Sequence, residues 1–164
     1  MTYMSNDFFV TEASEEDKSK IKEIIQKSFP RFFRYFAVHN LNSNGQILVS
    51  RKDQTSVGFA KLIWFQIGSR QFSCILWLAV HPDFRHKGIA ASLVGAGTKY
   101  LKTHGSEAVF ASVMHNNVAS LVTFKKEGFI IIGFRGLWKL FGWRIFSFYR
   151  EIWFVPSEFV LMHS

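Results

Sequence analysis

The segment from Leu78 to Ala90, with the sequence LAVHPDFRHKGIA, has the residue types and spacing best suited to chemistry. An apolar strand stops at Pro82, and Gly88 opens the next helix. Such a turn leaves backbone N–H groups unpaired at the positive end of the helix dipole, and Gly88 lets a phosphate approach them closely. With the basic residues 85–87 beside it, the turn predicts a pyrophosphate site. An ordinary capped helix with a basic first turn is the alternative.

A second candidate segment runs from Asn117 to Phe129, NVASLVTFKKEGF, and reads as a helix that ends at Gly128. Together the two segments resemble motifs A and B of the GCN5-related N-acetyltransferase (GNAT) superfamily. Motif A has the pattern Gln/Arg-x-x-Gly-x-Gly/Ala, which the chain matches with Arg85, Gly88 and Ala90. Motif B begins with Asn and ends in Gly-Phe, and Ser120 takes its usual alanine position. The resemblance covers nearly the whole chain.

The order of predicted elements agrees with that family. The predicted strands are Phe8–Thr11, Gln46–Arg51, Ser56–Ile67, Arg70–Val80, Ala108–Val113, Phe129–Leu140 and Arg144–Val155. The predicted helices are 14–28, 31–41, 88–104 and 117–127. The resemblance implies an α/β (α+β) fold: a mixed, mostly antiparallel sheet of about seven strands with about four flanking helices. A splayed fourth and fifth strand pair would bind the cofactor.

The cofactor that the resemblance implies is acetyl-CoA or another acyl-CoA. Its pantetheine arm would pair like an added strand with the opened edge of the motif A strand, and the turn amides would hold its pyrophosphate. The residues implied to bind it are Leu78, Ala79, Val80, Arg85, His86, Lys87, Gly88, Ile89, Ala90, Ala91, Asn117, Ser120 and Phe124. No metal is expected.

The catalytic groups follow less directly from the resemblance. The Val80 amide is the implied donor to the negative charge that develops on the thioester oxygen. Many relatives have a proton-donating tyrosine where this chain has Phe124, and Arg70–Val80 contains no glutamate to serve as base. His115 is then a candidate base, with His81 and Asp83 as nearby alternatives. Ser120 is a candidate proton donor, as are Thr123 and Tyr100, and the spacing does not select among them. Departure as a thiolate and a water relay are alternatives, as is a coenzyme A-binding sensor without turnover.

The acceptor site is implied by the family's use of the first two helices and the last two strands, here 29–39 and 134–154. Both segments are aromatic and basic. This favours an amine acceptor, either a small molecule or a protein, that carries a carboxylate or phosphate and an apolar body, or else an acyl group longer than acetyl on the cofactor. The candidate acceptor residues are Phe33, Arg34, Phe36, Arg135 and Arg144. A core and homodimer face is the alternative, and a nucleic-acid or membrane role for 134–154 is the less favoured one.

The bulk composition fits one domain over residues 1–164. Residues 1–23 hold six of the 12 acidic side chains but three of the 20 basic ones, so the remainder carries six acidic and 17 basic residues. That basic body favours an anionic ligand. The single cysteine, Cys74, lies in an apolar run and is expected to be buried and inert. With no leader pattern and only short apolar runs, a cytoplasmic protein is expected.

Overall fold

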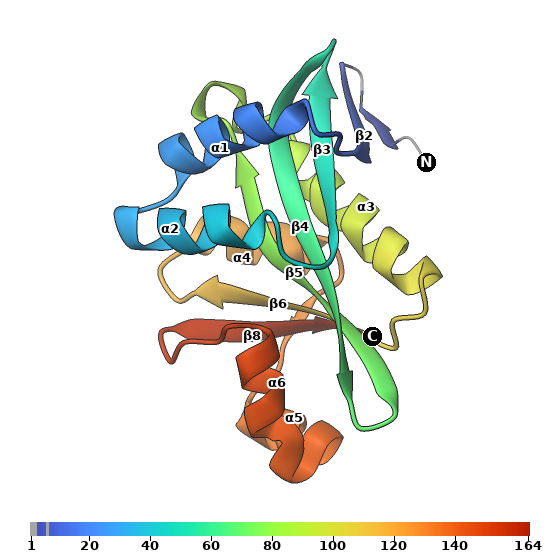
Figure 1. Ribbon diagram of the computed structural model, residues 1–164. Coiled ribbons are helices and arrows are strands. Elements are labelled where there is room, and N and C mark those ends of the chain that lie inside the picture. Colours follow the sequence, from blue (N-terminus) through green and yellow to red (C-terminus); the bar gives the residue numbers. More distant parts are fainter. Residues whose placement is uncertain (1–2, 6) are drawn as a thin grey trace. The chain divides into compact units, whose positions relative to one another are not determined.

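The computed structural model describes residues 3–5 and 7–164, which form two compact units. The first contains residues up to Leu62 together with Trp77–Gly97, and the second contains Ile63–Leu76 and Thr98–Ser164. The strands are β1 (Tyr3–Ser5), β2 (Phe8–Glu12), β3 (Gln46–Lys52), β4 (Thr55–Ile67), β5 (Arg70–Val80), β6 (Val109–Met114), β7 (Ile130–Ile131) and β8 (Glu158–His163) (Figure 1). They form a sheet with the order β1-β2-β3-β4-β5-β6-β8-β7.

The sheet is mixed and mostly antiparallel, as predicted. In the described residues β5 pairs with β6 in parallel, whereas β1–β2, β2–β3, β3–β4, β6–β8 and β7–β8 pair antiparallel. The helices are α1 (Asp17–Ser28), α2 (Arg31–Asn40), α3 (Ile89–Thr103), α4 (Val118–Lys126), α5 (Phe134–Phe141) and α6 (Ile145–Glu151), with 3-10 turns η1 (Pro82–Phe84) and η2 (Gly142–Arg144). The predicted fold class is therefore confirmed, with more helix than expected.

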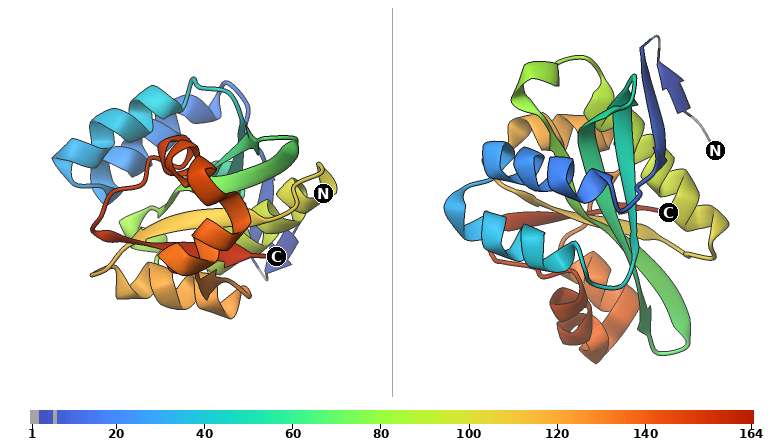
Figure 2. Two further views of the ribbon diagram at one scale, coloured as in Figure 1. Left: turned by 90° about the horizontal axis from the view of Figure 1, so that it is seen from below. Right: turned by 45° about the horizontal axis from the view of Figure 1, so that its top comes forward.

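The first unit packs α1 and α2 on one face of β3 and β4 (Figures 1 and 2). Its core consists of Ile21, Ile24, Ile25, Ala37, Leu41, Val49, Phe59 and Ala79. On α1 the three isoleucines recur at helical spacing and are fully buried, as their pattern predicts. On β4, a Cβ added at Gly58 would come within 3.2 Å of side-chain atoms of Ile89 and Leu93, so β4 and α3 pack at the closest distance that glycine allows.

The second unit has an aromatic core. Its buried residues are Phe65, Ile67, Phe72, Cys74, Ala108, Phe110, Leu137, Phe141, Ile145, Phe148, Ile152 and Val160. The Phe110 and Phe148 rings meet edge to face with centroids 4.7 Å apart, a favourable aromatic geometry. Cys74 is fully buried, which confirms that prediction, and its burial raises the pKa of its thiol. The hairpin between β4 and β5 turns at Gly68-Ser69, where Gly68 has a φ of 67°.

The prediction of two long final strands is wrong. Residues 134–141 and 145–151 are the helices α5 and α6, and the strands of this region are the short β7 and the later β8. Phe134, Leu137, Trp138 and Phe141 follow the helical spacing i, i+3, i+4 and i+7. The aromatic content of the segment, which favours strands, concealed this period. No helix in the described part of the chain has the length and apolarity needed to cross a membrane.

A buried carboxylate ties α1 to the sheet. Asp17 is 4% exposed and accepts hydrogen bonds from the Ser14 amide (2.7 Å), the Ser56 hydroxyl (2.6 Å) and the Arg51 guanidinium (2.6 Å). Burial alone would raise the pKa of Asp17, but the hydrogen bonds from Ser56, Ser14 and Arg51 outweigh burial and lower it below its ordinary value of 3.8. The predicted Ser14–Asp17 pairing is present, but α1 begins at Asp17, three residues later than the predicted start.

We expect Asp17→Asn to lower the free energy of unfolding by about 2–3 kcal/mol at pH 7, because it removes a charged acceptor from Arg51. A lowered folded pKa means that the carboxylate stabilises the fold above its unfolded pKa, and that this stability is lost as the pH falls through the folded value. Urea denaturation from pH 7 to pH 3 should show the difference shrinking at the acid end. The exposed hairpin variant Asp53→Asn is the control, and equal stability of Asp17→Asn and wild type would contradict the assignment.

Candidate active site

The strand-to-helix turn of the first unit has an unusual backbone. After β5 ends at Val80, the chain makes the single turn η1 and enters α3 at Ile89. His86 and Gly88 have left-handed φ angles of 60° and 77°. A left-handed histidine is uncommon, whereas glycine adopts this conformation freely. Left-handed residues of this kind are a component of the backbone nests that bind anions.

Six consecutive amides at this turn lack partners. In the described part of the chain, no hydrogen-bond acceptor is found for the backbone N–H groups of residues 86–91. The first hydrogen bond of α3 runs from the Ser92 amide to the Gly88 carbonyl, at 3.0 Å. A Cβ added at Gly88 would meet nothing within 4 Å, so the space in front of the turn is open. Open amides at a helix start are the groups that bind anions, and the pyrophosphate site at this turn stays a prediction.

The basic side chains of the turn are exposed, but two of them contact neighbouring groups of the same unit. Arg85 Nε donates to the Val80 carbonyl at 3.3 Å, and the Lys87 ammonium lies 5.5 Å from the centre of the Phe84 ring. Arg85 therefore helps to position the end of β5 in addition to supplying charge. His86 is exposed at the tip of the turn.

The Val80–His81 peptide is fixed from both sides. The His81 amide donates to the Val57 carbonyl of β4 at 2.8 Å. The Val80 carbonyl accepts from Arg85 and from the Ser28 hydroxyl of α1, each at 3.3 Å. Consecutive residues of an extended strand direct their amides to opposite sides, so the Val80 N–H points away from β4. These contacts fix the peptide that follows the predicted oxyanion donor, the Val80 N–H.

Pairing along β5 leaves part of the strand available. Its parallel register with β6 comprises Ser73–Ile75 against Val109–Ala111 in the described residues. Leu78, Ala79 and Val80, which the resemblance implies for pantetheine binding, lie beyond this paired stretch. Among the described residues no β6 partner is assigned to these three, and their pairing with an extended ligand stays a prediction.

The His81 ring contacts two charged residues of α1, which the sequence pattern did not predict. Its ring is 5% exposed, with Nε2 3.1 Å from the Lys27 ammonium and 3.6 Å from a Glu23 carboxylate oxygen. Hydrogen bonds from Lys20 and Lys27 lower the pKa of Glu23 to about 2. The spacing of these three charged residues on α1 predicts their ion pairs. That spacing does not predict the contact with His81, which is distant in sequence and joins α1 to the end of β5.

The motif B residues of the second unit have structural contacts of their own. Asn117 is the N-cap of α4, since its side-chain oxygen accepts from the Ser120 amide at 3.2 Å. Ser120 is half-buried on the first turn of that helix. The Phe124 ring is buried and packs edge to face on Phe129, with centroids 5.0 Å apart. The cofactor roles of all three remain predictions.

The candidate base lies in the second unit, and the candidate acceptor residues are divided between the two units. His115 is exposed after β6, its amide donates to the Ser157 carbonyl at 2.9 Å, and its ring lies 4.1 Å from that of Phe159. In the first unit, α2 brings together Phe33, Arg34 and Phe36. The Phe33 ring lies 6.3 Å from that of Trp77, and Arg34 Nε donates to the Phe29 carbonyl at 2.6 Å. In the second unit, Arg135 is exposed on α5 and the Arg144 guanidinium lies over Gly68.

Comparison with known proteins places these features in a family. The model described as "Acetyltransferase (GNAT) family" matches residues 9–129. The chain belongs to the GNAT acetyltransferase family. This match confirms the resemblance drawn from the two motifs. A comparison with curated protein sequences finds no match.

Solved GNAT structures share the fold. PaiA N-acetyltransferase from Thermoplasma acidophilum, in complex with coenzyme A, superposes with a TM-score of 0.69 at 16% identity, over 98% of this chain and 99% of its own. The ribosomal-protein-S18-alanine N-acetyltransferase from Escherichia coli gives 0.66 at 15% identity, over 94% and 90%. A glucosamine N-acetyltransferase region of a fungal multi-domain β-N-acetylglucosaminidase gives 0.67 at 15%, over 79% of this chain and 18% of that protein.

The capping role of Asn117 is directly testable. Asn117→Ala removes the acceptor for the Ser120 amide and should lower the free energy of unfolding by about 1 kcal/mol. Asn117→Asp keeps a capping oxygen and should retain most of that stability. Urea denaturation of both variants beside the wild type provides the comparison. Equal losses in the two variants would show that the amide group, not the capping oxygen, is what the fold requires.

Proposed function

We propose that this chain transfers an acetyl group from acetyl-CoA to an amine acceptor. The observation that carries the proposal is the run of six unpartnered amides at residues 86–91, since a diphosphate is the anion that such a helix start accommodates best. Membership of the GNAT family supports the reaction class. When bound, acetyl-CoA supplies an activated acetyl thioester, so that no covalent enzyme intermediate is required.

Two parts of the first unit would hold the cofactor. The amides of residues 86–91 would bind the pyrophosphate, with Arg85 and Lys87 adding positive charge beside it. The unpaired edge of Leu78–Val80 would pair with the amide groups of the pantetheine arm. Asn117, Ser120 and Phe124 of the second unit are proposed, from the motif B resemblance alone, for the far side of the cofactor.

The Val80 amide is the proposed catalytic group of this chain. It would donate a hydrogen bond to the acyl oxygen as negative charge develops there, while the contacts of Ser28 and Arg85 with the Val80 carbonyl would hold the adjacent Val80–His81 peptide. The acceptor amine would lose its proton to water or to His115, which is exposed. Phe124 has no proton to donate, so the sulfur would depart as a thiolate, which a thiol pKa of about 8.5 permits.

The aromatic and basic character of α2 supports an acceptor of a particular kind. Phe33 and Phe36 offer apolar surface, and Arg34, between them in the sequence, adds a guanidinium. An amine with an apolar body and a carboxylate or phosphate would match this combination. Arg135 and Arg144 remain proposed acceptor residues by resemblance only.

Replacing Gly88 tests cofactor binding. In Gly88→Trp the indole fills the open space before the amides, and the residue is strained at a φ of 77°, so acetyl-CoA affinity should fall at least about 100-fold. Isothermal titration calorimetry with acetyl-CoA measures the effect. Gly142→Trp is the matched control, because Gly142 also has positive φ (53°) and open space but belongs to the turn after α5.

Wild-type chain that gives no binding heat, or Gly88→Trp that binds as tightly as wild type, would refute the proposed cofactor site. Binding without turnover toward a panel of small-molecule and peptide amines would instead support the coenzyme A sensor, which the absence of a hydroxyl at Phe124 favours. Thermal melts of both glycine variants would confirm that each still folds.

Replacing Val80 tests the proposed oxyanion donor. Val80→Pro removes the backbone N–H without removing a hydrogen bond to β4, and should lower kcat by about 10²–10³-fold while acetyl-CoA still binds. Val80→Ala keeps the amide and is the control. Steady-state acetyl transfer to an amine acceptor, with calorimetry of both variants, separates turnover from binding. Equal kcat for Val80→Pro and Val80→Ala would assign the donor role elsewhere.

A further inference from the structure

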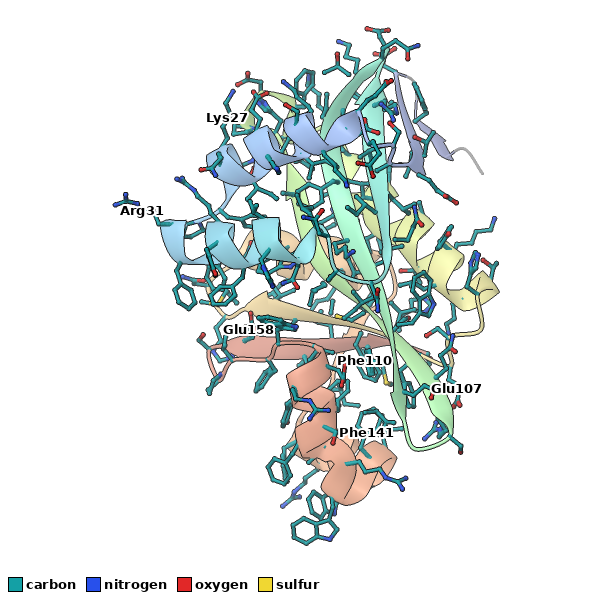
Figure 3. All side chains as sticks on the ribbon, viewed as in Figure 1. Lys27, Arg31, Glu107, Phe110, Phe141 and Glu158 are labelled. Carbon is teal, nitrogen blue, oxygen red and sulfur yellow. The ribbon has the colours of Figure 1, made fainter. Side chains whose placement is uncertain are left out.

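Helices α5 and α6 expose aromatic side chains that their own packing does not use. Their inner residues, including Leu137, Phe141 and Phe148, fill the core of the second unit. Figure 3 shows Phe141 directed from α5 toward Phe110, and the two rings lie 5.9 Å apart. The aromatic–basic face is the other side of these helices and the turn between them, and consists of Phe134, Arg135, Trp138, Lys139, Trp143, Arg144, Phe146 and Arg150.

The exposure on this face is large for such side chains. Trp143 is 79% exposed, Phe146 is 64% exposed and Phe134 is 56% exposed. The Trp138 ring lies between Phe134 and Trp143, with centroids 5.7 and 5.0 Å away, so the aromatics form a continuous strip. A contiguous exposed apolar strip of this kind marks an interaction surface.

A hollow of about 380 Å³ opens on the face, lined by Phe134, Arg135, Trp138 and Lys139. The two rings and the aliphatic stems of the two basic residues form its wall, with both charges at the rim. An acyl chain beneath a phosphate headgroup has the same arrangement of apolar and anionic parts.

The charge of the face is one-sided. Residues 129–157 contain four basic side chains and one acidic one, Glu151, which pairs with Arg150 at 3.2 Å. Arg135, Lys139 and Arg144 have no ion-pair partner within the described residues. The face therefore presents the uncompensated positive charges of Arg135 and Lys139 beside exposed tryptophan and phenylalanine, while the Arg144 guanidinium packs over Gly68 of the β4–β5 turn.

We propose that the aromatic–basic face binds the surface of anionic lipid bilayers. Tryptophan and phenylalanine enter the headgroup boundary readily, and cations beside them gain from anionic lipids. A second copy of the chain fits poorly, because a two-fold contact would place this basic face against the same basic face of the partner. The apolar hollow also favours lipid over single-stranded nucleic acid, whose bases stack on rings and have no chain to insert.

Vesicle flotation of the full chain tests this proposal. We expect flotation with vesicles of equal parts phosphatidylcholine and phosphatidylglycerol, little with phosphatidylcholine alone, and weakening as salt rises. The double variant Trp143→Ser/Phe146→Ser should reduce vesicle affinity at least about tenfold. Arg135→Gln/Lys139→Gln should reduce it by a similar factor. The control is Phe32→Ser/Tyr35→Ser, which removes two equally exposed aromatics (68% and 71%) from α2.

Three results would overturn the proposal. The first is absence of flotation with the anionic vesicles, and the second is flotation that the Trp143/Phe146 variant retains in full while it melts like wild type. The third is that the wild-type chain does not bind vesicles but self-associates or binds an oligonucleotide, and that the Trp143/Phe146 variant loses this interaction. Gly88→Trp should float like wild type, so that failure here is separable from failure of the acetyl-CoA site.

Discussion

The unpartnered amides of residues 86–91 are the constraint from which the rest of the site follows. In the described part of the chain these amides have no acceptor, and those at the start of α3 are open as at any helix N-terminus, where water or an anion can bind them. His86 and Gly88, both left-handed, lie just before the helix and belong to the same open run. The chain has, in effect, a fixed positive site that needs no side chain.

The elements around this turn serve to hold the end of β5 in place. Val57 of β4 binds the His81 amide, while Ser28 of α1 and Arg85 bind the Val80 carbonyl. Contact between the His81 ring and Lys27 joins the same strand end to α1. Asp17 in turn fixes the start of α1 through Arg51 and Ser56. These contacts together hold the end of β5 beside the proposed oxyanion donor, the Val80 N–H.

Between Phe8 and Gly128 the sequence predicted every strand and α-helix, because the apolar period and the glycines at turns agreed there, but it missed β1 and the turn η1. It failed after Gly128, where high aromatic content suggested strands although the spacing of Phe134, Leu137 and Phe141 is helical. In the site, local backbone chemistry at Gly88 was predictable from the residues. The burial of His81 against α1 and of Phe124 against Phe129 was not, since both depend on contacts between segments distant in sequence or on packing that no local pattern encodes.

The central claim is that the backbone amides of residues 86–91 bind the pyrophosphate of coenzyme A. The most direct measurement is a titration of the isotope-labelled chain followed by amide ¹⁵N–¹H correlation spectra, with coenzyme A and, in parallel, with pantetheine, which lacks the pyrophosphate. Coenzyme A should shift these six amides strongly and pantetheine should leave them almost unmoved. Saturable binding of coenzyme A that shifts other amides but not these would contradict the account.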